Sequence, residues 1–143
     1  MLVLAQRVKE ASLYVDGRLI GEMTNGLVVY VCFEKGDTDR NDWLARKILA
    51  LRVFEDDNGK LNKSVTDIGG GVVLVSNFTL AGDCQKGTRP SFDNAMQYDV
   101  AIKYFNDLVS IVKALHNNVI AGTFGADMQV KNIADGPVNV LIK

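Results

Sequence analysis

The chain has 143 residues, of which 48% are hydrophobic and 23% are charged. This profile predicts one globular domain over residues 1–143, with a core that needs no disulfide or metal ion. The formal net charge of −1 excludes the broad basic surface that tight nonspecific binding of nucleic acid requires, although an enzyme that binds one end of an RNA remains compatible with it. No stretch approaches the roughly 20 apolar residues of a membrane span, and residues 1–10 lack the pattern of a signal peptide. We therefore expect a cytoplasmic protein.

The two cysteines lie in contrasting surroundings. Cys32 belongs to an apolar run and is expected to be a small core residue, whereas Cys84 lies in a polar stretch. Two such cysteines favour a reducing compartment over a disulfide framework. Neither has a second cysteine or a histidine close in sequence, so we expect no zinc site and no cofactor.

The N-terminal part of the chain predicts three strands. Residues 3–15 alternate apolar and polar side chains over short stretches, and Asp16-Gly17 is a turn signal, so residues 18–22 should form the return strand of a hairpin. After Asn25-Gly26, residues 27–33 form a continuous apolar run that suits a buried central strand.

The middle of the chain predicts a helix and another buried strand. Asp37-Thr38 offers an N-cap, and apolar residues then follow at helical spacing, so we expect an amphipathic helix over residues 39–51. Residues 56–59 have the composition of a turn. Gly69-Gly70-Gly71 lets the chain change direction before a buried strand over residues 72–75.

The C-terminal half predicts a long loop, a second helix and two final strands. Residues 81–94 are rich in glycine and charge, and apolar side chains then recur at helical spacing over residues 98–115. Residues 128–133 and 138–142 are expected to be strands, joined at Asp135-Gly136-Pro137. Two helices among six or seven strands imply an α/β fold in which two main amphipathic helices pack on a mixed sheet.

The familiar catalytic arrangements are missing. The single histidine, His116, falls at the expected C-terminal end of a helix, where a surface cap that suits the helix dipole is the simplest interpretation. No serine–histidine–aspartate triad can be built around it, and neither a zinc-protease motif nor a P-loop is present. The three glycines at 69–71 precede a strand rather than a helix, so they indicate a bend and not a phosphate-binding loop.

Residues Ser76-Asn77-Phe78-Thr79-Leu80 form the first candidate site segment, because they directly follow a buried apolar strand. Side chains and backbone N–H groups at a strand end can project into a cleft. Alternatively, Ser76 and Thr79 bond to nearby backbone where the strand ends.

The second candidate segment is Lys86-Gly87-Thr88-Arg89-Pro90-Ser91-Phe92. Its two cations can meet phosphate groups, and its aromatic ring can stack on a base. A solvated surface loop is the alternative.

The third candidate segment is Asp135-Gly136-Pro137-Val138. Read alone, it is a plain turn. Its Gly-Pro bond can also be cis, which would be a fixed feature of the structure.

Taken together and in order, short segments spread over almost the whole chain resemble the D-aminoacyl-tRNA deacylase family. Each segment is weak alone, and the joint order and spacing carry the resemblance. The segments are Gln6-Arg7-Val8, Gly26-Leu27-Val28-Val29, Leu51-Arg52-Val53-Phe54, Lys60-Leu61-Asn62, Ser76-Asn77-Phe78-Thr79-Leu80, Lys86-Gly87-Thr88-Arg89-Pro90-Ser91-Phe92, Phe124-Gly125-Ala126-Asp127-Met128-Gln129-Val130 and Asp135-Gly136-Pro137-Val138.

The resemblance implies a strongly curved mixed sheet and a homodimer with two active sites at the subunit interface. It implies hydrolysis of D-aminoacyl-tRNA, and of glycyl-tRNA mischarged on alanine tRNA, as chiral proofreading in translation. The partners are then the acceptor end of aminoacyl-tRNA and a second copy of the chain, with no DNA and no membrane. No metal or other cofactor is implied.

The resemblance also assigns roles to residues of this chain. Gly136-Pro137 corresponds to a Gly-cisPro element that enters the partner's pocket, and Arg7 to a residue that supports this element. From the candidate segments we predict catalytic roles for Ser76, Asn77, Phe78 and Thr79, and substrate or tRNA binding by Lys86, Arg89 and Phe92. Met128 is expected either to line the amino-acid pocket, because methionine is adaptable, or to be an ordinary core residue.

Two departures from the family keep alternative functions open. The family usually has glutamine in place of Asn77 and threonine in place of Asn139. A sibling deacylase that edits small L-aminoacyl-tRNA, or a noncatalytic module that binds RNA ends, remains an alternative to the D-specific enzyme.

Two mechanisms are compatible with these residues. In the first, backbone N–H groups near Phe78 and Thr79 stabilise the oxyanion, while the terminal 2′-hydroxyl of the tRNA assists the attacking water. In the second, the Thr79 hydroxyl is a covalent nucleophile, which requires a base that the sequence does not reveal. In both, an L-residue is excluded because its Cβ would meet the backbone of Gly136-Pro137, whereas glycine has no Cβ to reject.

Overall fold

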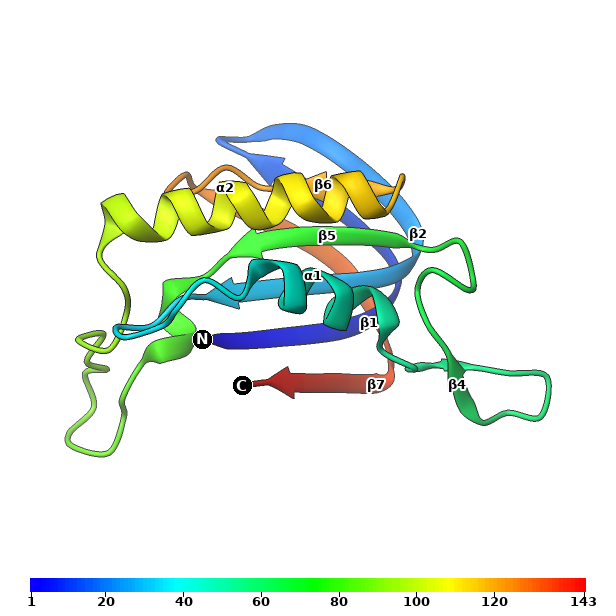
Figure 1. Ribbon diagram of the computed structural model, residues 1–143, viewed down its shortest axis with the longest axis horizontal. Coiled ribbons are helices and arrows are strands. Elements are labelled where there is room, and N and C mark those ends of the chain that lie inside the picture. Colours follow the sequence, from blue (N-terminus) through cyan, green and yellow to red (C-terminus); the bar gives the residue numbers. More distant parts are fainter.

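The computed structural model describes all of residues 1–143, and its centre is a mixed five-stranded sheet (Figure 1). The strand order is β6-β5-β2-β1-β7; β5 runs parallel to β2 and β6, and β1 runs antiparallel to β2 and β7. The strands of the sheet are β1 (Leu2–Val15), β2 (Arg18–Cys32), β5 (Gly71–Ser76), β6 (Val119–Ala121) and β7 (Met128–Ile142). The predicted α/β fold with a mixed sheet and two helices is confirmed.

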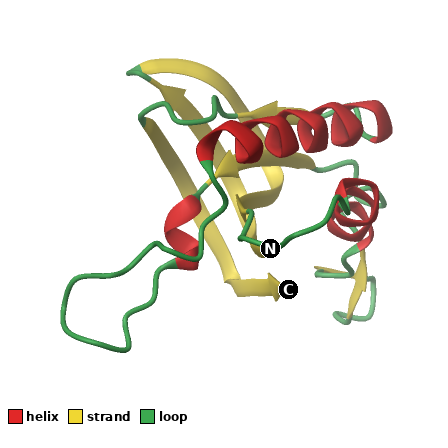
Figure 2. Cartoon of the chain, turned by 60° about the vertical axis from the view of Figure 1, so that its left-hand side comes forward, coloured by secondary structure: helices red, strands yellow, loops and turns green.

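Both helices lie on the same face of the sheet, α1 (Asn41–Ala50) beside α2 (Tyr98–Leu115) (Figures 1 and 2). Phe105 and Leu108 of α2 and Leu44 of α1 join the sheet side chains in a core of 19 buried residues. The opposite face carries a second core of eight buried residues, which the sheet encloses by curving over itself.

The two N-terminal strands form one long hairpin. Asp16 and Gly17 have φ angles of 48° and 78°, the positive values that a tight hairpin turn requires, so the predicted turn is confirmed. The predicted break at Asn25-Gly26 is wrong, because β2 continues through it. Gly26 is there for a different reason: a Cβ at this position would lie 2.0 Å from the carbonyl oxygen of Gly71, so only glycine lets β2 and β5 pair this closely.

The predicted N-cap of the first helix is wrong. Asp37 instead binds the N-terminal ammonium of Met1 at 2.6 Å and accepts the backbone N–H of Glu34 at 2.7 Å. The helix therefore begins at Asn41 after Arg40, which makes no side-chain cap. Burial of the ammonium would lower its pKa, but the hydrogen bonds with the two carboxylates outweigh this effect and raise it.

The turn at residues 56–59 and the second helix are where the sequence places them. The turn joins β3 (Phe54–Glu55) to β4 (Leu61–Lys63) in a small separate hairpin, and α2 has the predicted bounds. The backbone N–H groups of Lys60 and Asn58 donate to Asp56 and hold its pKa below the usual value.

The C-terminal strands differ from the prediction, because residues 128–142 form one strand with a bulge instead of two strands with a turn. Gln6 pairs with Asn139 and Val8 with Ala134, so residues 135–138 stand opposite Arg7 alone. The Gly136-Pro137 peptide in this bulge is cis, and Gly136 has a φ of 110°.

The single histidine fixes a loop and is not a free surface cap. His116 follows α2 as its C-cap, is half-buried, and its Nε2 lies 2.8 Å from the carbonyl oxygen of Gly70.

Neither helix combines the length and the apolar character that a membrane span requires. Cys32 is buried and Cys84 exposed, as expected, and both thiols are free.

Candidate active site

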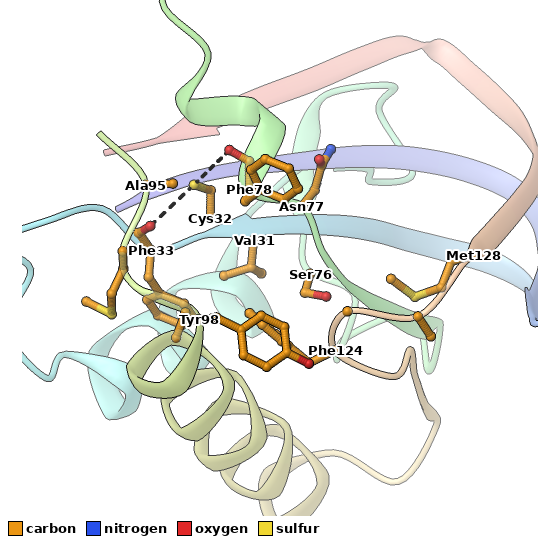
Figure 3. A pocket seen from close by; sticks show the side chains of 14 residues that line it. Val31, Cys32, Phe33, Ser76, Asn77, Phe78, Ala95, Tyr98, Phe124 and Met128 are labelled. Atoms are coloured by element: carbon orange, nitrogen blue, oxygen red, sulfur yellow. Dashed lines mark hydrogen bonds between the residues drawn. The ribbon is translucent and has the colours of Figure 1, made fainter. Parts of the chain in front are cut away.

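A cavity of about 500 Å³ opens where β2 and β5 end (Figure 3). Parallel strands bring their carboxyl ends to the same edge of a sheet, and ligands commonly bind there. Eleven of the lining residues are hydrophobic, which suits a flat or apolar part of a ligand. The lining comprises Val31, Cys32, Phe33, Ser76, Asn77, Phe78, Ala95, Met96, Tyr98, Ala101, Phe124, Gly125, Ala126 and Met128.

The first candidate segment lies at this cavity, as the sequence predicts. The backbone N–H of Asn77 donates to the carbonyl of Val31 at 2.8 Å, which ties the end of β5 to β2. The chain then turns through the short 3-10 helix η1 (Phe78–Ala81). Ser76, Asn77 and Phe78 line the cavity, the first two half-buried and Phe78 exposed, and Thr79 is exposed beside them.

One side chain organises this turn. The Oδ1 atom of Asn77 accepts the backbone N–H of Thr79 at 3.2 Å and also the hydroxyl of Thr79. Asn77 is therefore the N-cap of η1. The predicted alternative, in which Ser76 and Thr79 bond to nearby backbone, is not what the structure shows: the Thr79 hydroxyl bonds to the side chain of Asn77, and the segment faces a cavity.

A buried thiol lies beneath the turn. Cys32 Sγ lies 3.4 Å from the carbonyl oxygen of Phe33 and 3.6 Å from that of Phe78, and Figure 3 draws both contacts. Burial raises the pKa of the Cys32 thiol, so it stays a neutral, unreactive group in the wall of the cavity.

The opposite wall is aromatic and was not predicted from the sequence. Tyr98, at the start of α2, packs edge-on against Phe124 with ring centroids 5.1 Å apart. A Cβ at Gly125 would lie 2.6 Å from the Tyr98 hydroxyl, so the ring closely covers this backbone. The helical spacing of the sequence marks the buried face of α2, but it gives no sign that the exposed Tyr98 borders a cavity. Met128 completes this side of the cavity.

The second candidate segment meets the site through its aromatic residue. Phe92 packs edge-on against Phe78, with ring centroids 5.2 Å apart, and lies close to Gly82. Lys86 and Arg89 are exposed in the same loop and lie outside the lining of the cavity.

Arg7 contacts the third candidate segment, as the resemblance implied. Arg7 is buried, its Nη1 donates to the carbonyl of Val53 at 2.7 Å, and its Nε lies 3.1 Å from Oδ2 of Asp135. The Nε contact is an ion pair without hydrogen-bond alignment. A Cβ at Gly136 would lie 3.1 Å from Nη2 of Arg7, so the guanidinium lies directly beside the bulge.

Gly136 and Pro137 are exposed and are not part of the cavity lining of their own chain. The site thus offers an amide, two hydroxyls and the backbone N–H of Phe78 at the edge of an apolar cavity, with an exposed bulge elsewhere on the chain. Such groups can polarise a carbonyl and orient a ligand, which suits acyl transfer to water.

Solved structures share this architecture. One described as a c-Myc DNA Unwinding Element Binding Protein has a TM-score of 0.92 and 36% identity, over 100% of this chain and 98% of that chain. Another, described as a probable eukaryotic D-amino acid tRNA deacylase, has a TM-score of 0.85 at 17% identity and covers 99% and 97% of the two chains, which shows the shared fold. The fold and the strand-end cavity place the chain in this class of α/β proteins.

The sequence comparisons define the family. The family model described as D-Tyr-tRNA(Tyr) deacylase matches residues 4–143, and the chain belongs to this family. A D-aminoacyl-tRNA deacylase of Clostridium novyi is 48% identical over 99% of this chain and 96% of its own length. One of Aromatoleum aromaticum is 45% identical over 100% and 95%. The resemblance seen in the sequence is confirmed.

Proposed function

We propose that this chain hydrolyses the ester bond of D-aminoacyl-tRNA and releases the free amino acid and the tRNA. The observation that carries the proposal is the Ser76–Thr79 turn at the mouth of an apolar cavity, in a chain 48% identical over nearly its full length to a D-aminoacyl-tRNA deacylase. Such an enzyme acts where tRNA is charged, which is consistent with the expected cytoplasmic location.

The attacking water is activated mainly by the substrate. The hydroxyl of Thr79 donates to the amide oxygen of Asn77, and an amide oxygen does not take up a proton at neutral pH. His116 bonds to Gly70, before β5, whereas Thr79 follows its other end. The six residues of β5 separate them by about 20 Å. These contacts favour assistance by the terminal 2′-hydroxyl of the tRNA over a base on the protein.

The competing mechanism uses the Thr79 hydroxyl as a nucleophile. It predicts an acyl-enzyme on Thr79 and complete loss of activity in Thr79→Ala. Assistance by the tRNA predicts that Thr79→Ala keeps substantial activity and that a 2′-deoxy terminal adenosine abolishes hydrolysis. Mass spectrometry of the enzyme quenched during turnover distinguishes the two, because only the nucleophilic mechanism leaves a covalent adduct on the protein.

Handedness is read by the backbone of Gly136-Pro137 from a second copy of the chain. The pair is exposed, and the ion pair with Arg7 holds the bulge that carries it. β7 is an edge strand of the sheet, which leaves one side free to face a partner. The side chain of a D-residue points away from this backbone, whereas the Cβ of an L-residue would clash with it. Glycine has no Cβ and is not excluded, so glycyl-tRNA is a second substrate.

The acceptor end of the tRNA is bound by the loop that contains Lys86 and Arg89. Both side chains are exposed and available for phosphate groups. Phe92 packs on Phe78 and extends the aromatic surface from this loop to the cavity. The net charge of −1 supports contact with one end of an RNA and not with long nucleic acid, so DNA, which the name of one structural relative mentions, is not part of the proposal.

Incubation with excess D-tyrosyl-tRNA tests the proposal. An enzyme turns over many equivalents of substrate, whereas a noncatalytic RNA-end binder protects the ester and slows its spontaneous hydrolysis. D- and L-alanyl-tRNA, measured side by side, separate this enzyme from a sibling that edits small L-residues. Protection of the ester, or hydrolysis of L-alanyl-tRNA alone, would contradict the proposal.

A further inference from the structure

The side chain of Asn77 has only one orientation compatible with its neighbours. The backbone N–H of Thr79 can only donate, so the atom 3.2 Å from it must be the amide oxygen of Asn77 and not the amide nitrogen. The hydroxyl of Thr79 donates to the same oxygen. The two bonds leave the Nδ2 group directed away from Thr79, with both of its hydrogens unused within the chain.

We propose that Nδ2 of Asn77 donates a hydrogen bond to the carbonyl oxygen of the ester and stabilises the oxyanion that forms when water attacks. This inference rests on the proposed deacylase function and assigns the donor within it. Asn77 is then a catalytic residue, and Thr79 is a positioning residue that fixes the amide.

Of the two backbone N–H donors expected from the sequence, those of Phe78 and Thr79, only the first is free, and this supports the assignment. The N–H of Thr79 is engaged by Asn77 and is not free for a substrate oxygen. Phe78 is the first residue of η1, and the N–H of a first helical residue has no acceptor within the helix. The donors left at the turn are therefore Nδ2 of Asn77 and the N–H of Phe78, on adjacent residues.

The surroundings strengthen such a donor. Asn77 is half-buried in a lining that is mostly hydrophobic. Figure 3 shows its amide on the Phe78 side of the cavity, across from Tyr98 and Phe124. An oriented donor at the edge of an apolar cavity needs no reorganisation when charge develops, and the low local polarity increases its effect.

The variant Asn77→Asp tests the proposal, because it changes the donor and keeps the shape. A carboxylate still accepts both hydrogen bonds from Thr79, but it lacks N–H groups and places a negative charge beside the oxyanion. We expect kcat on D-tyrosyl-tRNA to fall by about 100-fold or more, the usual effect of losing an oxyanion donor. KM and the melting temperature should stay close to the wild-type values.

The pH profile separates a donor from a merely structural residue. A protonated carboxyl group again offers a hydrogen to the oxyanion. The ratio of variant to wild-type kcat should therefore rise about tenfold per pH unit as the pH falls from 7 to 5, towards the usual pKa of an aspartic acid. Asn117→Asp, at an exposed position after α2, is the matched control and should show a constant ratio near one.

The second variant, Thr79→Val, removes the hydroxyl but keeps the backbone N–H that orients the amide. It should lose less than tenfold in kcat, far less than Asn77→Asp. A kcat of Asn77→Asp within threefold of wild type, or a loss that stays constant from pH 7 to 5, would overturn the proposal. Turnover by the wild-type chain in the same assay tests the deacylase function separately.

Discussion

The two halves of the proposed site are built in different ways. The turn that follows β5 is held by local contacts, since Asn77 bonds to Thr79 two residues away. The bulge at Gly136-Pro137 is held by Arg7, a buried residue almost 130 positions earlier in the chain. The proposed chemistry thus lies on a locally closed turn, whereas the proposed filter for handedness depends on long-range packing. Mutations in the turn and in the bulge should therefore have different effects on catalysis, on selectivity and on stability.

Outside the η1 turn, the largest effect is expected from Gly136→Ala. Its φ of 110° is strained for alanine, and the new Cβ would lie 2.9 Å from Cγ2 of Val138. The bulge must shift, so we expect kcat/KM on D-tyrosyl-tRNA to fall by about 100-fold, whereas the η1 turn stays intact. Steady-state kinetics on D- and L-tyrosyl-tRNA measure the effect, and unchanged kcat/KM on both substrates would remove the bulge from the site.

Mixing two inactive variants shows whether the halves come from different chains. In an equal mixture of Asn77→Asp and Gly136→Ala, a shared site is intact only when its turn comes from the Gly136→Ala chain and its bulge from the Asn77→Asp chain. Random pairing makes this true of about a quarter of the sites, so activity should return to about that fraction of wild type. If both halves came from one chain, no site would be intact and no activity would return.

Arg7→Lys should weaken the bulge with a smaller effect. Lysine keeps the charge but cannot contact the carbonyl of Val53 and Asp135 together, as the guanidinium does. We expect a loss of about 1–3 kcal/mol in the free energy of unfolding and a lower ratio of D- to L-tyrosyl-tRNA hydrolysis. Urea denaturation and paired kinetics measure the two effects, and an unchanged ratio would show that Arg7 does not support the filter.

Neutralising the loop cations should affect binding alone. The double variant Lys86→Gln/Arg89→Gln should raise KM several-fold at low salt and leave kcat unchanged. The slope of log KM against log salt should decrease by about 1–2, because up to two phosphate contacts are lost. An unchanged KM at low salt would place these residues outside the tRNA interface.

The smallest effect is expected at the N-terminal ammonium. Its folded pKa is raised, so its contacts with Asp37 and Glu34 stabilise the fold below the unfolded pKa of about 8 and lose this effect as the pH rises through the folded pKa. Asp37→Asn should lower stability by at most about 1 kcal/mol at pH 7 and less at pH 10. Denaturation at both pH values measures this, and activity per folded enzyme should not change.

Features fixed by neighbouring residues could be predicted from the sequence. The helical spacing gave the bounds of α2, and Asp16-Gly17 gave the hairpin turn, because both depend on local backbone preferences. The turn after β5 was also expected at a cleft, since it follows a buried strand. The bond from the backbone N–H of Thr79 to the side chain of Asn77 agrees with the local preference of asparagine for backbone N–H groups two residues on.

Features fixed by distant residues could not be predicted in this way. Asp37 is of a residue type that often caps a helix, but its carboxylate binds the N-terminal ammonium instead of the first N–H groups of α1. Gly26 suggests a turn, yet it lies within a strand, where glycine is needed because Gly71 of the neighbouring strand is too close for a Cβ. The aromatic wall of Tyr98 and Phe124 joins segments that no local pattern connects. Family resemblance supplied the proposed role of Gly136-Pro137, which composition alone would have left as a turn.

The most direct test of the central idea, that a rigid piece of main chain leaves no room for the Cβ of the wrong enantiomer, is the ratio of kcat/KM for D- and L-tyrosyl-tRNA on the wild-type chain. Exclusion by Gly136-Pro137 predicts a ratio of about 100 or more, together with measurable hydrolysis of glycyl-tRNA. Equal hydrolysis of the two enantiomers would contradict the account.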